Sequence, residues 1–291
     1  IIVCDDDVEL KSHLHAVDLS NIKIIQTPIN DTWARDFGAI TVQKDNSFVV
    51  YDFMFNGWGL KFASDKDNLI NRHIFEKHIF NTKDFLVPDI VLEGGSIESD
   101  GKGTVLTTTN CLLSPNRNPH LTQNEIEQKL KDLFGLERVL WLGSGHLIGD
   151  DTDAHIDTVA RFCDEHTIAY VQCTDRNEVH YVDLKKMEME LNQLKTIDGQ
   201  SYRLISLPMA DAVFASDDNR RLPATYANFL IMNEVVLMPT YQLRQDEEAI
   251  NQLQTAFPSK KVIGVDCSAL ILQHGSLHCI TMQFPKGSIH F

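Results

Sequence analysis

The sequence predicts an α/β protein in which a strand–helix unit recurs along one domain. Short apolar runs rich in Val, Ile and Phe alternate with segments whose apolar residues recur every three or four positions. Such alternation is typical of α/β proteins, and the units follow one another at roughly 50 to 60 residues. No linker rich in Pro, Gly or Ser divides the chain. We therefore expect a single domain over residues 1–291, built from repeated β/α units.

The expected strands are apolar runs bounded by turn-forming residues, at residues 22–25, 48–53, 90–92, 104–108, 139–142, 167–171, 204–207, 229–232, 235–238, 261–265 and 278–282. The expected helices have apolar residues at three- and four-residue spacing, at residues 68–78, 123–134, 184–194 and 246–257. The second helix also has marked ends, because Thr122 and Glu125 resemble a capping box and Gly135 follows its last residue.

The chain carries 41 acidic and 26 basic residues, which gives a formal net charge of −15. This charge disfavours nucleic acid and anionic membrane surfaces as partners and is compatible with a cationic ligand. No apolar run approaches the roughly 20 residues that a membrane span needs. We therefore expect a small cation as partner, with no nucleic acid and no membrane.

The six cysteines lack CxxC pairing, so we expect no disulfide scaffold in a chain of this size. Cys4, Cys111, Cys163 and Cys173 lie in or beside apolar runs, where a reduced core thiol is the usual occupant. The chain opens at Ile1, without a methionine and directly in a strand-like segment. We expect the N-terminal part of the first repeat to be missing.

Cys279 follows a turn at Gly275 and lies at the start of the last expected strand, where its thiol can face a cleft. It can equally be a buried core residue, which is the commoner role of a free cysteine. On a strand, His278 and Cys279 would point to opposite faces, so His278 is not expected to act as the base for this thiol. The base has to come from another part of the chain.

His155 and Asp157 are the candidates for that base and its partner, because an extended segment would place both side chains on one face. Three aspartates precede them within residues 150–153, so an acidic surface loop is an alternative interpretation. A metal site made from His155, Asp157, Cys163 and His166 is another, although the spacing matches no zinc pattern.

Two further carboxylates lie at expected strand ends or turns. Asp36 closes the stretch Trp-Ala-Arg-Asp, and Glu93 precedes a pair of glycines. Asp36 can simply pair with Arg35, and Glu93 can be a solvated turn carboxylate. A glycine pair also allows close backbone approach, so Glu93 can instead be held within a cleft.

Together these residues suit chemistry on a guanidinium group, which is planar, permanently charged and matched by carboxylates. An enzyme that attacks its central carbon needs two carboxylates to hold the nitrogens, a soft nucleophile and a proton shuttle for the leaving ammonia. Asp36, Asp157, Cys279 and His155 supply that set. The sequence therefore favours a cysteine hydrolase of guanidinium compounds.

Several stretches resemble the agmatine deiminase family, which is grouped with the bacterial peptidylarginine deiminases. They are Trp-Ala-Arg-Asp at 33–36, Asn-Gly-Trp-Gly at 56–59, Glu-Gly-Gly-Ser at 93–96, Asp-Gly-Lys-Gly-Thr at 100–104, Asp-Thr-Asp-Ala-His-Ile-Asp at 151–157, Pro-Ala-Thr-Tyr-Ala-Asn-Phe at 223–229 and His-Gly-Ser-Leu-His-Cys at 274–279. The motifs occur in the family's order, from about residue 25 to residue 285.

The resemblance implies the pentein fold, a five-bladed β/α propeller with pseudo-fivefold ββαβ-type repeats around a central active site. It also implies hydrolysis without a cofactor or a metal. By position it implies Cys279 as the nucleophile, His155 as the general acid and base, and Asp36 with Asp157 as the guanidinium clamp. Glu93 is implied to orient His155.

The resemblance further implies that Trp33, Trp58, Asp151 and the loop at Gly275 contact the substrate, with the indole faces packing on its chain or cation. Two departures from the family pattern bear on loop shape. Agmatine deiminases commonly have glycine where this chain has Ala154, and their final loop is commonly richer in glycine than Gln-His-Gly-Ser here.

The expected reaction converts agmatine to N-carbamoylputrescine and ammonia through a covalent thiouronium on Cys279. The resemblance implies a cytoplasmic enzyme of polyamine and putrescine biosynthesis, and a homodimer is left open. Peptidylarginine or free arginine is the alternative substrate, and Arg35 as the one arginine of the site motifs favours agmatine. A non-catalytic guanidine-binding protein and an amidinotransferase are further alternatives.

Overall fold

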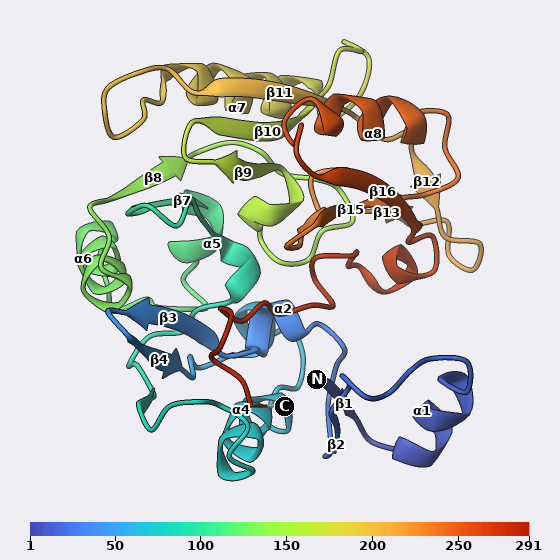
Figure 1. Cartoon of the computed structure of the whole chain (residues 1–291). Helices are drawn as coiled ribbons and strands as arrows, with labels where there is room; N and C mark the ends of the chain where they lie inside the picture. Colours follow the sequence, from blue (N-terminus) through green and yellow to red (C-terminus); the bar gives the residue numbers. More distant parts are fainter. Residues whose placement is uncertain (291) are drawn as a thin grey trace. The chain divides into compact units, whose positions relative to one another are not determined.

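In the computed structural model of the chain, residues 1–290 are described and fall into two compact units (Figure 1). Unit 1 comprises Ile1–Gly94 together with the C-terminal residues from Met282 on, and unit 2 comprises Gly95–Thr281. The single catalytic domain over the whole chain stays a prediction.

Four three-stranded sheets share one arrangement, in which an antiparallel pair is followed by a third, parallel strand. Unit 1 contains β3 (Ile40–Lys44), β4 (Ser47–Tyr51) and β5 (Phe85–Leu86). Unit 2 contains β6 (Ile97–Ser99), β7 (Thr104–Thr108) and β8 (Arg138–Leu142); β9 (Ala160–Asp164), β10 (Thr167–Gln172) and β11 (Arg203–Pro208); and β14 (Leu230–Ile231), β15 (Val235–Thr240) and β16 (Lys261–Asp266). In each sheet at least one helix precedes the parallel strand, because a parallel connection needs a crossover. The expected α/β class with repeated units is confirmed.

The connecting helices are α3 (Gly57–Leu60) and α4 (Asp67–Glu76) in unit 1, and α5 (Thr109–Leu112), α6 (Gln123–Phe134), α7 (Tyr181–Gln193) and α8 (Asp246–Gln254) in unit 2. The remaining elements are β1 (Ile2–Cys4), α1 (Asp7–His13), β2 (Ile24–Gln26), α2 (Ala34–Phe37), β12 (Val213–Phe214), β13 (Arg221–Leu222) and the 3-10 helices η1 (Gly94–Ser96), η2 (Ile156–Thr158) and η3 (Leu270–Gln273). In unit 2, α8 packs on β11 and β16, and α7 packs on β10 (Figure 1).

The sequence explains the best-defined elements directly. Helix α6 begins at a true capping box, since the Thr122 side chain accepts from the Glu125 amide and the Glu125 side chain reaches back, and it ends at a left-handed Gly135. Strands β7 and β10 are buried almost throughout, as central strands covered on both faces are. Side chains from the β9–β11 and β14–β16 sheets and their helices form the apolar core of unit 2.

Two expected strands and one expected extended segment are wrong. Residues 278–282 form turns and irregular backbone, residues 90–92 make only an isolated bridge from Val91 to Met54, and residues 155–157 lead into the 3-10 helix η2 instead of staying extended. The first and third of these carry candidate site residues, so the corrections change the local geometry described below.

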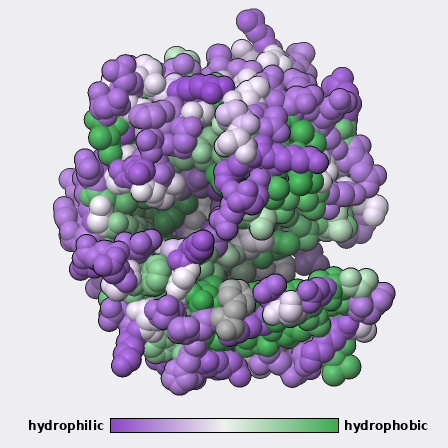
Figure 2. All heavy atoms as spheres, in the orientation of Figure 1, coloured by the Kyte–Doolittle hydropathy of each residue, from purple (hydrophilic) through white to green (hydrophobic). Residues whose placement is uncertain are grey.

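Hydrophilic residues cover much of the face shown in Figure 2. None of the helices within residues 1–290 combines the length and the apolar composition needed to cross a bilayer.

Candidate active site

In unit 1 the candidate site is built on the one-turn helix α2, which replaces the strand end or turn expected there. Trp33 precedes the helix as its N-cap residue, and Asp36 lies within it, buried. The indole Nε1 of Trp58 donates to Asp36 Oδ2 at 2.9 Å. The Arg35 side chain reaches Met282 Sδ at 3.6 Å and Gln283 Oε1 at 3.3 Å.

Trp58 is aimed at Asp36 by a left-handed turn. Residues Gly57, Trp58, Gly59 and Leu60 have φ angles of 66°, 54°, 83° and 67° in succession. A Cβ atom on Gly57 would lie 2.1 Å from the carbonyl oxygen of Phe62, so only glycine fits there. A left-handed tryptophan costs backbone energy, and such strain is commonly concentrated at functional sites. The turn therefore holds an indole donor on a buried carboxylate.

Glu93 is fixed in unit 1 by the glycine that follows it. A Cβ atom on Gly94 would lie 2.1 Å from the carbonyl oxygen of Arg35, so the Glu-Gly-Gly segment packs closely on the backbone of α2. Glu93 itself is only 1% exposed, which rules out the solvated turn carboxylate considered from the sequence.

In unit 2, Cys279 lies in a buried turn centred on the side chain of Asn228. Asn228 Oδ1 accepts from the backbone amides of His278 at 2.9 Å and Cys279 at 3.3 Å, and from Cys279 Sγ at 3.4 Å. Its Nδ2 donates to the carbonyl oxygen of Asp157 at 3.2 Å. One buried amide thus joins the cysteine turn to the segment that carries His155 and Asp157.

His278 is not directed away from this cluster, because the strand expected there is a turn. Its Nδ1 donates to Asp157 Oδ2 at 2.6 Å, and both side chains are buried. The residue after it is Cys279. The sequence argument that placed His278 and Cys279 on opposite faces of a strand is therefore wrong, and His278 instead fixes the orientation of the Asp157 carboxylate.

The acidic segment before His155 is a tightly bonded loop. Asp150 accepts from the amides of Thr152 at 3.0 Å and Ala154 at 2.9 Å, while the buried Arg117 binds Asp153 at 2.7 Å and the Thr152 carbonyl oxygen at 2.8 Å. Much of the negative charge is therefore used to shape the loop. A solvated acidic surface loop does not describe it.

Ala154 adopts a backbone conformation that favours glycine, the residue that the family resemblance leads us to expect at this position. Its φ is 68°, in the left-handed region that favours glycine, and its carbonyl oxygen accepts from Thr108 Oγ1 at 2.7 Å. His155 follows, buried, with its amide bonded to Thr152 Oγ1 at 3.1 Å. The strained residue and its bonds position the histidine at the start of η2.

Asp151 and Gly275 come together through His274. The His274 Nδ1 lies 3.9 Å from Asp151 Oδ2 and hydrogen-bonds the carbonyl oxygen of Gly149 at 3.1 Å. His274 is also left-handed, with φ of 71°, and the buried Gly275 follows it. The loop that leads to Cys279 is thus attached to the loop that leads to His155.

Asn228 and His278 were not among the site residues predicted from the sequence. Asn228 lies inside the motif at 223–229, and a fully buried amide in an apolar run is the signal that could have found it. Within residues 1–290, no three of the residues weighed as metal ligands, His155, Asp157, Cys163 and His166, bring ligand atoms within 4.8 Å of one another.

Two of the four cysteines expected in the core are buried there. Cys111 and Cys173 are buried, and Cys4 and Cys163 are partly exposed, so the core prediction is confirmed for the first two. All six are free thiols, as expected without a disulfide scaffold. Loss of hydration on burial raises the pKa of Cys163 to about 12 and also raises the pKa of Cys173 and Cys267.

Comparison with known proteins identifies close relatives. A family model described as Porphyromonas-type peptidyl-arginine deiminase matches residues 1–285. A protein of Marinomonas sp. named "Putative agmatine deiminase" is 37% identical over 287 residues, covering 91% of this chain and 76% of that protein.

Two solved structures resemble the chain over nearly its whole length. The structure titled "Putative Arginine Deiminase from Porphyromonas gingivalis" is 49% identical with a TM-score of 0.95, covering 99% of this chain and 85% of that one. C. jejuni agmatine deiminase with substrate bound is 40% identical with a TM-score of 0.87, covering 95% of this chain and 79% of that one. The predicted pentein fold class is confirmed.

Proposed function

Because the chain belongs to the agmatine deiminase family, within the Porphyromonas-type peptidyl-arginine deiminases, we propose that it converts agmatine to N-carbamoylputrescine and ammonia. The family makes it a hydrolase of amidine C–N bonds. The observation that supports this reaction best is the Asn228 side chain, whose amide bonds the Cys279 turn and the Asp157 backbone at once. A thiol and a carboxylate held by one rigid group suit attack on a cation.

The proposed chemistry uses Cys279 and His155 in two half-reactions. The Cys279 thiolate attacks the guanidinium carbon, a C–S bond forms, and the terminal C–N bond breaks as His155 supplies the proton that completes ammonia. His155 then takes a proton from water, the resulting hydroxide attacks the same carbon, and the C–S bond breaks with its electron pair returning to sulfur. One water is consumed and one ammonia is released, with no redox change.

Asp36 and Asp157 are assigned to hold the guanidinium nitrogens. Each has one carboxylate oxygen bonded within its own unit, Asp36 to the Trp58 indole and Asp157 to His278. A carboxylate already oriented by a donor loses less freedom when it binds a planar cation. On the family resemblance, Glu93 orients His155, and Trp33, Trp58, Asp151 and the Gly275 loop contact the rest of the substrate.

The hydrogen bonds of two arginine side chains, Arg35 and Arg117, favour agmatine over arginine as the substrate. A substrate carboxylate calls for an arginine partner. Arg35 is buried and bonded to Met282 and Gln283, and Arg117 is buried and bonded to Asp153 and Thr152. Both side chains already serve the fold, whereas Asp151 suits a distal amine.

Deimination of free arginine or peptidylarginine is the second candidate. It is favoured by the description of the matching family and by the 49% identity to the structure titled as a P. gingivalis arginine deiminase. The chemistry at Cys279 would be the same, and only the contacts to the far end of the substrate would differ.

The test is ammonia release from agmatine, free arginine and a blocked arginyl peptide, with Cys279→Ala and Cys267→Ala compared at each. We expect turnover of agmatine in the unmodified chain and in Cys267→Ala, and no turnover in Cys279→Ala. A strong preference for the peptide would replace agmatine as substrate. Retention of guanidine binding in Cys279→Ala, with ammonia release lost, would exclude a purely binding role.

A further inference from the structure

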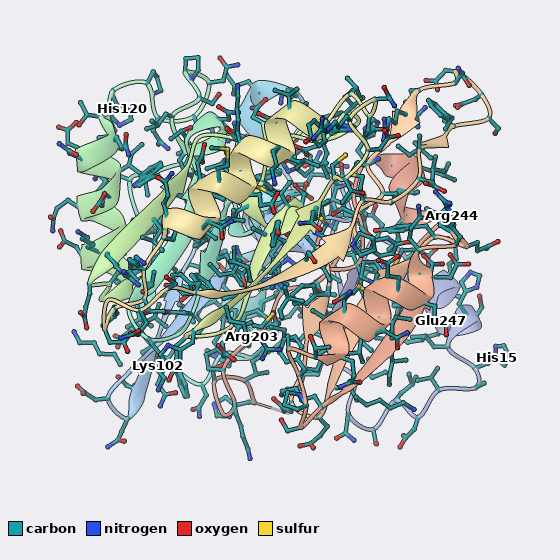
Figure 3. The ribbon with its side chains drawn as sticks, turned by 90° about the horizontal axis from the view of Figure 1, so that it is seen from above. His15, Lys102, His120, Arg203, Arg244 and Glu247 are labelled. Carbon is teal, nitrogen blue, oxygen red and sulfur yellow. The ribbon has the colours of Figure 1, made fainter. Side chains whose placement is uncertain are left out.

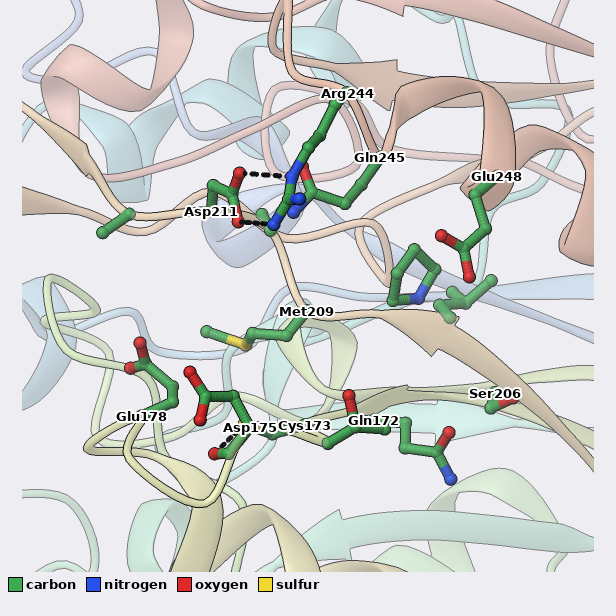
Figure 4. Close-up of a pocket in the computed structure, with 15 residues that line it drawn as sticks. Gln172, Cys173, Asp175, Glu178, Ser206, Met209, Asp211, Arg244, Gln245 and Glu248 are labelled. Carbon is green, nitrogen blue, oxygen red and sulfur yellow. Dashed lines mark hydrogen bonds and ion pairs between the residues drawn. The ribbon is translucent and has the colours of Figure 1, made fainter.

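Unit 2 contains a pocket that the proposed reaction does not use. It has a volume of ≈ 440 Å³ and lies where the parallel strands β10 and β11 end, against the first turn of α8 (Figure 4). The carboxyl ends of parallel strands are common positions for ligands in α/β proteins. The volume falls within the range of small-molecule sites.

The pocket is lined by an excess of negative charge. Asp175, Glu178, Asp211 and Glu248 line it, with Arg244 as the one basic residue of the lining, and Glu178 is also paired with Arg221, which lies outside the lining, at 2.7 Å. Arg244 is paired with Asp211, at 2.9 Å and 3.2 Å. Acidic side chains alone do not make a binding site, since solvated carboxylates are common on a chain of this composition.

Gln245 supplies an independent observation that points to a ligand. Its side chain lines the pocket and is only 9% exposed, and its Oε1 is buried without a hydrogen-bond partner among the described residues. The Gln245 side chain also hydrogen-bonds Asp211. Because a carboxylate only accepts, the donor is Nε2. The oxygen and nitrogen of the Gln245 amide therefore cannot be interchanged. An unpaired buried carbonyl group is costly and calls for a donor.

The arrangement of the acids favours an organic cation over a metal ion. Within residues 1–290, no three carboxylates of this pocket bring oxygens within 4.8 Å of one another, so they form no cage for a divalent metal. In Figure 4 the Met209 side chain lies between Asp211, Arg244 and Gln245 at one end and Asp175 and Glu178 at the other. Two polar ends separated by an apolar side chain match a short alkyl chain with a charge at each end.

Entry to the Gln245 end depends on Arg244, whose side chain is 80% exposed. An ion pair this exposed contributes little stability, so an incoming cation can compete for Asp211. A primary ammonium carries three N–H donors, which allows it to bond Asp211 and Gln245 Oε1 together. The Arg244 guanidinium is tied to its own backbone at the rim of the pocket, and it does not hydrogen-bond Gln245 Oε1.

We propose that this pocket binds a protonated aliphatic diamine. One ammonium takes the place of Arg244 on Asp211 and donates to Gln245 Oε1, and the methylene chain lies along Met209. The second ammonium lies at the other end, beside Asp175 and Glu178, and Glu248 adds negative charge on the α8 side of the pocket (Figure 4). This site is separate from Cys279 and does not rest on the proposed deiminase reaction.

The test uses the methyl resonance of Met209 in the full chain, labelled with ¹³C-methyl methionine and assigned by its absence in Met209→Leu. Six other methionines serve as internal references, since the chain has 7. On titration with 1,4-diaminobutane, we expect a saturable shift at Met209. Butane-1,4-diol, which has the same length without charge, should give none, and MgCl₂ should give none.

Three variants make the result specific to this pocket. Gln245→Leu and Glu248→Gln should each raise the diamine concentration needed for half-saturation about tenfold, the effect of one charge-assisted hydrogen bond. Glu247→Gln is the matched control, because Glu247 precedes Glu248 on α8 but does not line the pocket (Figure 3). It should leave half-saturation unchanged.

Several results would overturn the proposal: no Met209 shift with the diamine, a shift with magnesium instead, or a shift that survives both Gln245→Leu and Glu248→Gln. A loss in Glu247→Gln as large as that in Glu248→Gln would also overturn it, because it would show attraction by the general negative surface. Thermal unfolding of each variant confirms that the chain remains folded during the comparison.

Discussion

At the scale of single residues, the candidate site depends on polar side chains that fix carboxylates within each unit. Trp58 holds Asp36 in unit 1, and His278 holds Asp157 in unit 2. The tryptophan is kept in place at the expense of a left-handed backbone. A buried carboxylate with one fixed oxygen presents a defined direction to a planar cation, which is what recognition of a guanidinium requires.

Replacing Trp58 by phenylalanine tests this orientation while keeping an aromatic ring against Phe55 and Phe62. We expect Trp58→Phe to lower kcat/KM for agmatine about tenfold to a hundredfold, the effect of losing a hydrogen bond to a charged group. Trp141→Phe is the control, because Trp141 also donates to a carboxylate, Glu127 Oε2, at 3.3 Å. Equal losses in both variants would contradict a specific role for Trp58.

The residues proposed to carry the chemistry could be selected from the sequence, whereas the residues that position them could not. Cys279, His155, Asp36 and Asp157 stand out because a thiol, an imidazole and two carboxylates together form the set that chemistry on a guanidinium group needs. Asn228 acts through bonds to residues 50 and 71 positions away in the sequence, so the motif at 223–229 marks the residue but does not reveal its partners.

At the scale of elements, the loop over residues 150–154 shows how one left-handed residue is stabilised. Alanine disfavours the φ of 68° that Ala154 adopts. Two hydrogen bonds hold it there, one from its amide to Asp150 and one from Thr108 to its carbonyl oxygen. Glycine would adopt the same backbone without steric cost.

Comparing Ala154→Gly with Ala160→Gly measures that cost. Both alanines are buried, and Ala160 lies in strand β9 with ordinary backbone. Each variant loses a methyl group and makes the unfolded chain more flexible, but only Ala154→Gly relieves left-handed strain. We expect Ala154→Gly to lose about 1–2 kcal/mol less in free energy of unfolding than Ala160→Gly. Urea denaturation gives both values, and equal losses would contradict the strain.

A second element-scale prediction concerns His180, which anchors the loop before Asp151. His180 Nε2 accepts the Ile148 amide at 2.8 Å, and Nδ1 donates to Glu178 at 2.6 Å. Burial, with the charge of Arg221 adding to it, lowers the pKa of His180 from its ordinary 6.5. The unfolded chain therefore takes up the proton first as the pH falls. The stability that His180 provides is present above about pH 6.5 and is lost as the pH falls through its lowered folded-state pKa.

Glutamine at position 180 can accept the Ile148 amide without titrating. We expect His180→Gln to flatten the decline in free energy of unfolding between roughly pH 6.5 and pH 5, measured by urea denaturation. His166→Gln, which replaces an exposed histidine, should keep the decline. An unchanged slope in His180→Gln would show that other groups cause the acid sensitivity.

Elements with local signals could be predicted well. Helix α6 matches its expected range because Thr122, Glu125 and Gly135 mark both ends, and β7 matches because it is a short apolar run between turns. Residues 278–282 have the composition of a strand but form turns, because their polar backbone groups bond across the chain to Asn228 instead of to a neighbouring strand.

At the scale of the whole molecule, repetition of one sheet arrangement was visible only as spacing. The units lack visible sequence similarity, since the repeat requires apolar strands and a crossover helix but not particular residues. The charge of −15 belongs to this scale as well. It favours cations in general, and our two proposals place a cation near Cys279 and another near Gln245.

The central claim is that Cys279 forms a covalent intermediate with a guanidinium substrate. The most direct measurement is mass spectrometry of the chain after acid quenching during turnover of agmatine. We expect an added mass equal to agmatine minus ammonia, located on the peptide that contains Cys279 and absent from Cys279→Ala. An adduct on another residue, or undiminished ammonia release by folded Cys279→Ala, would contradict it.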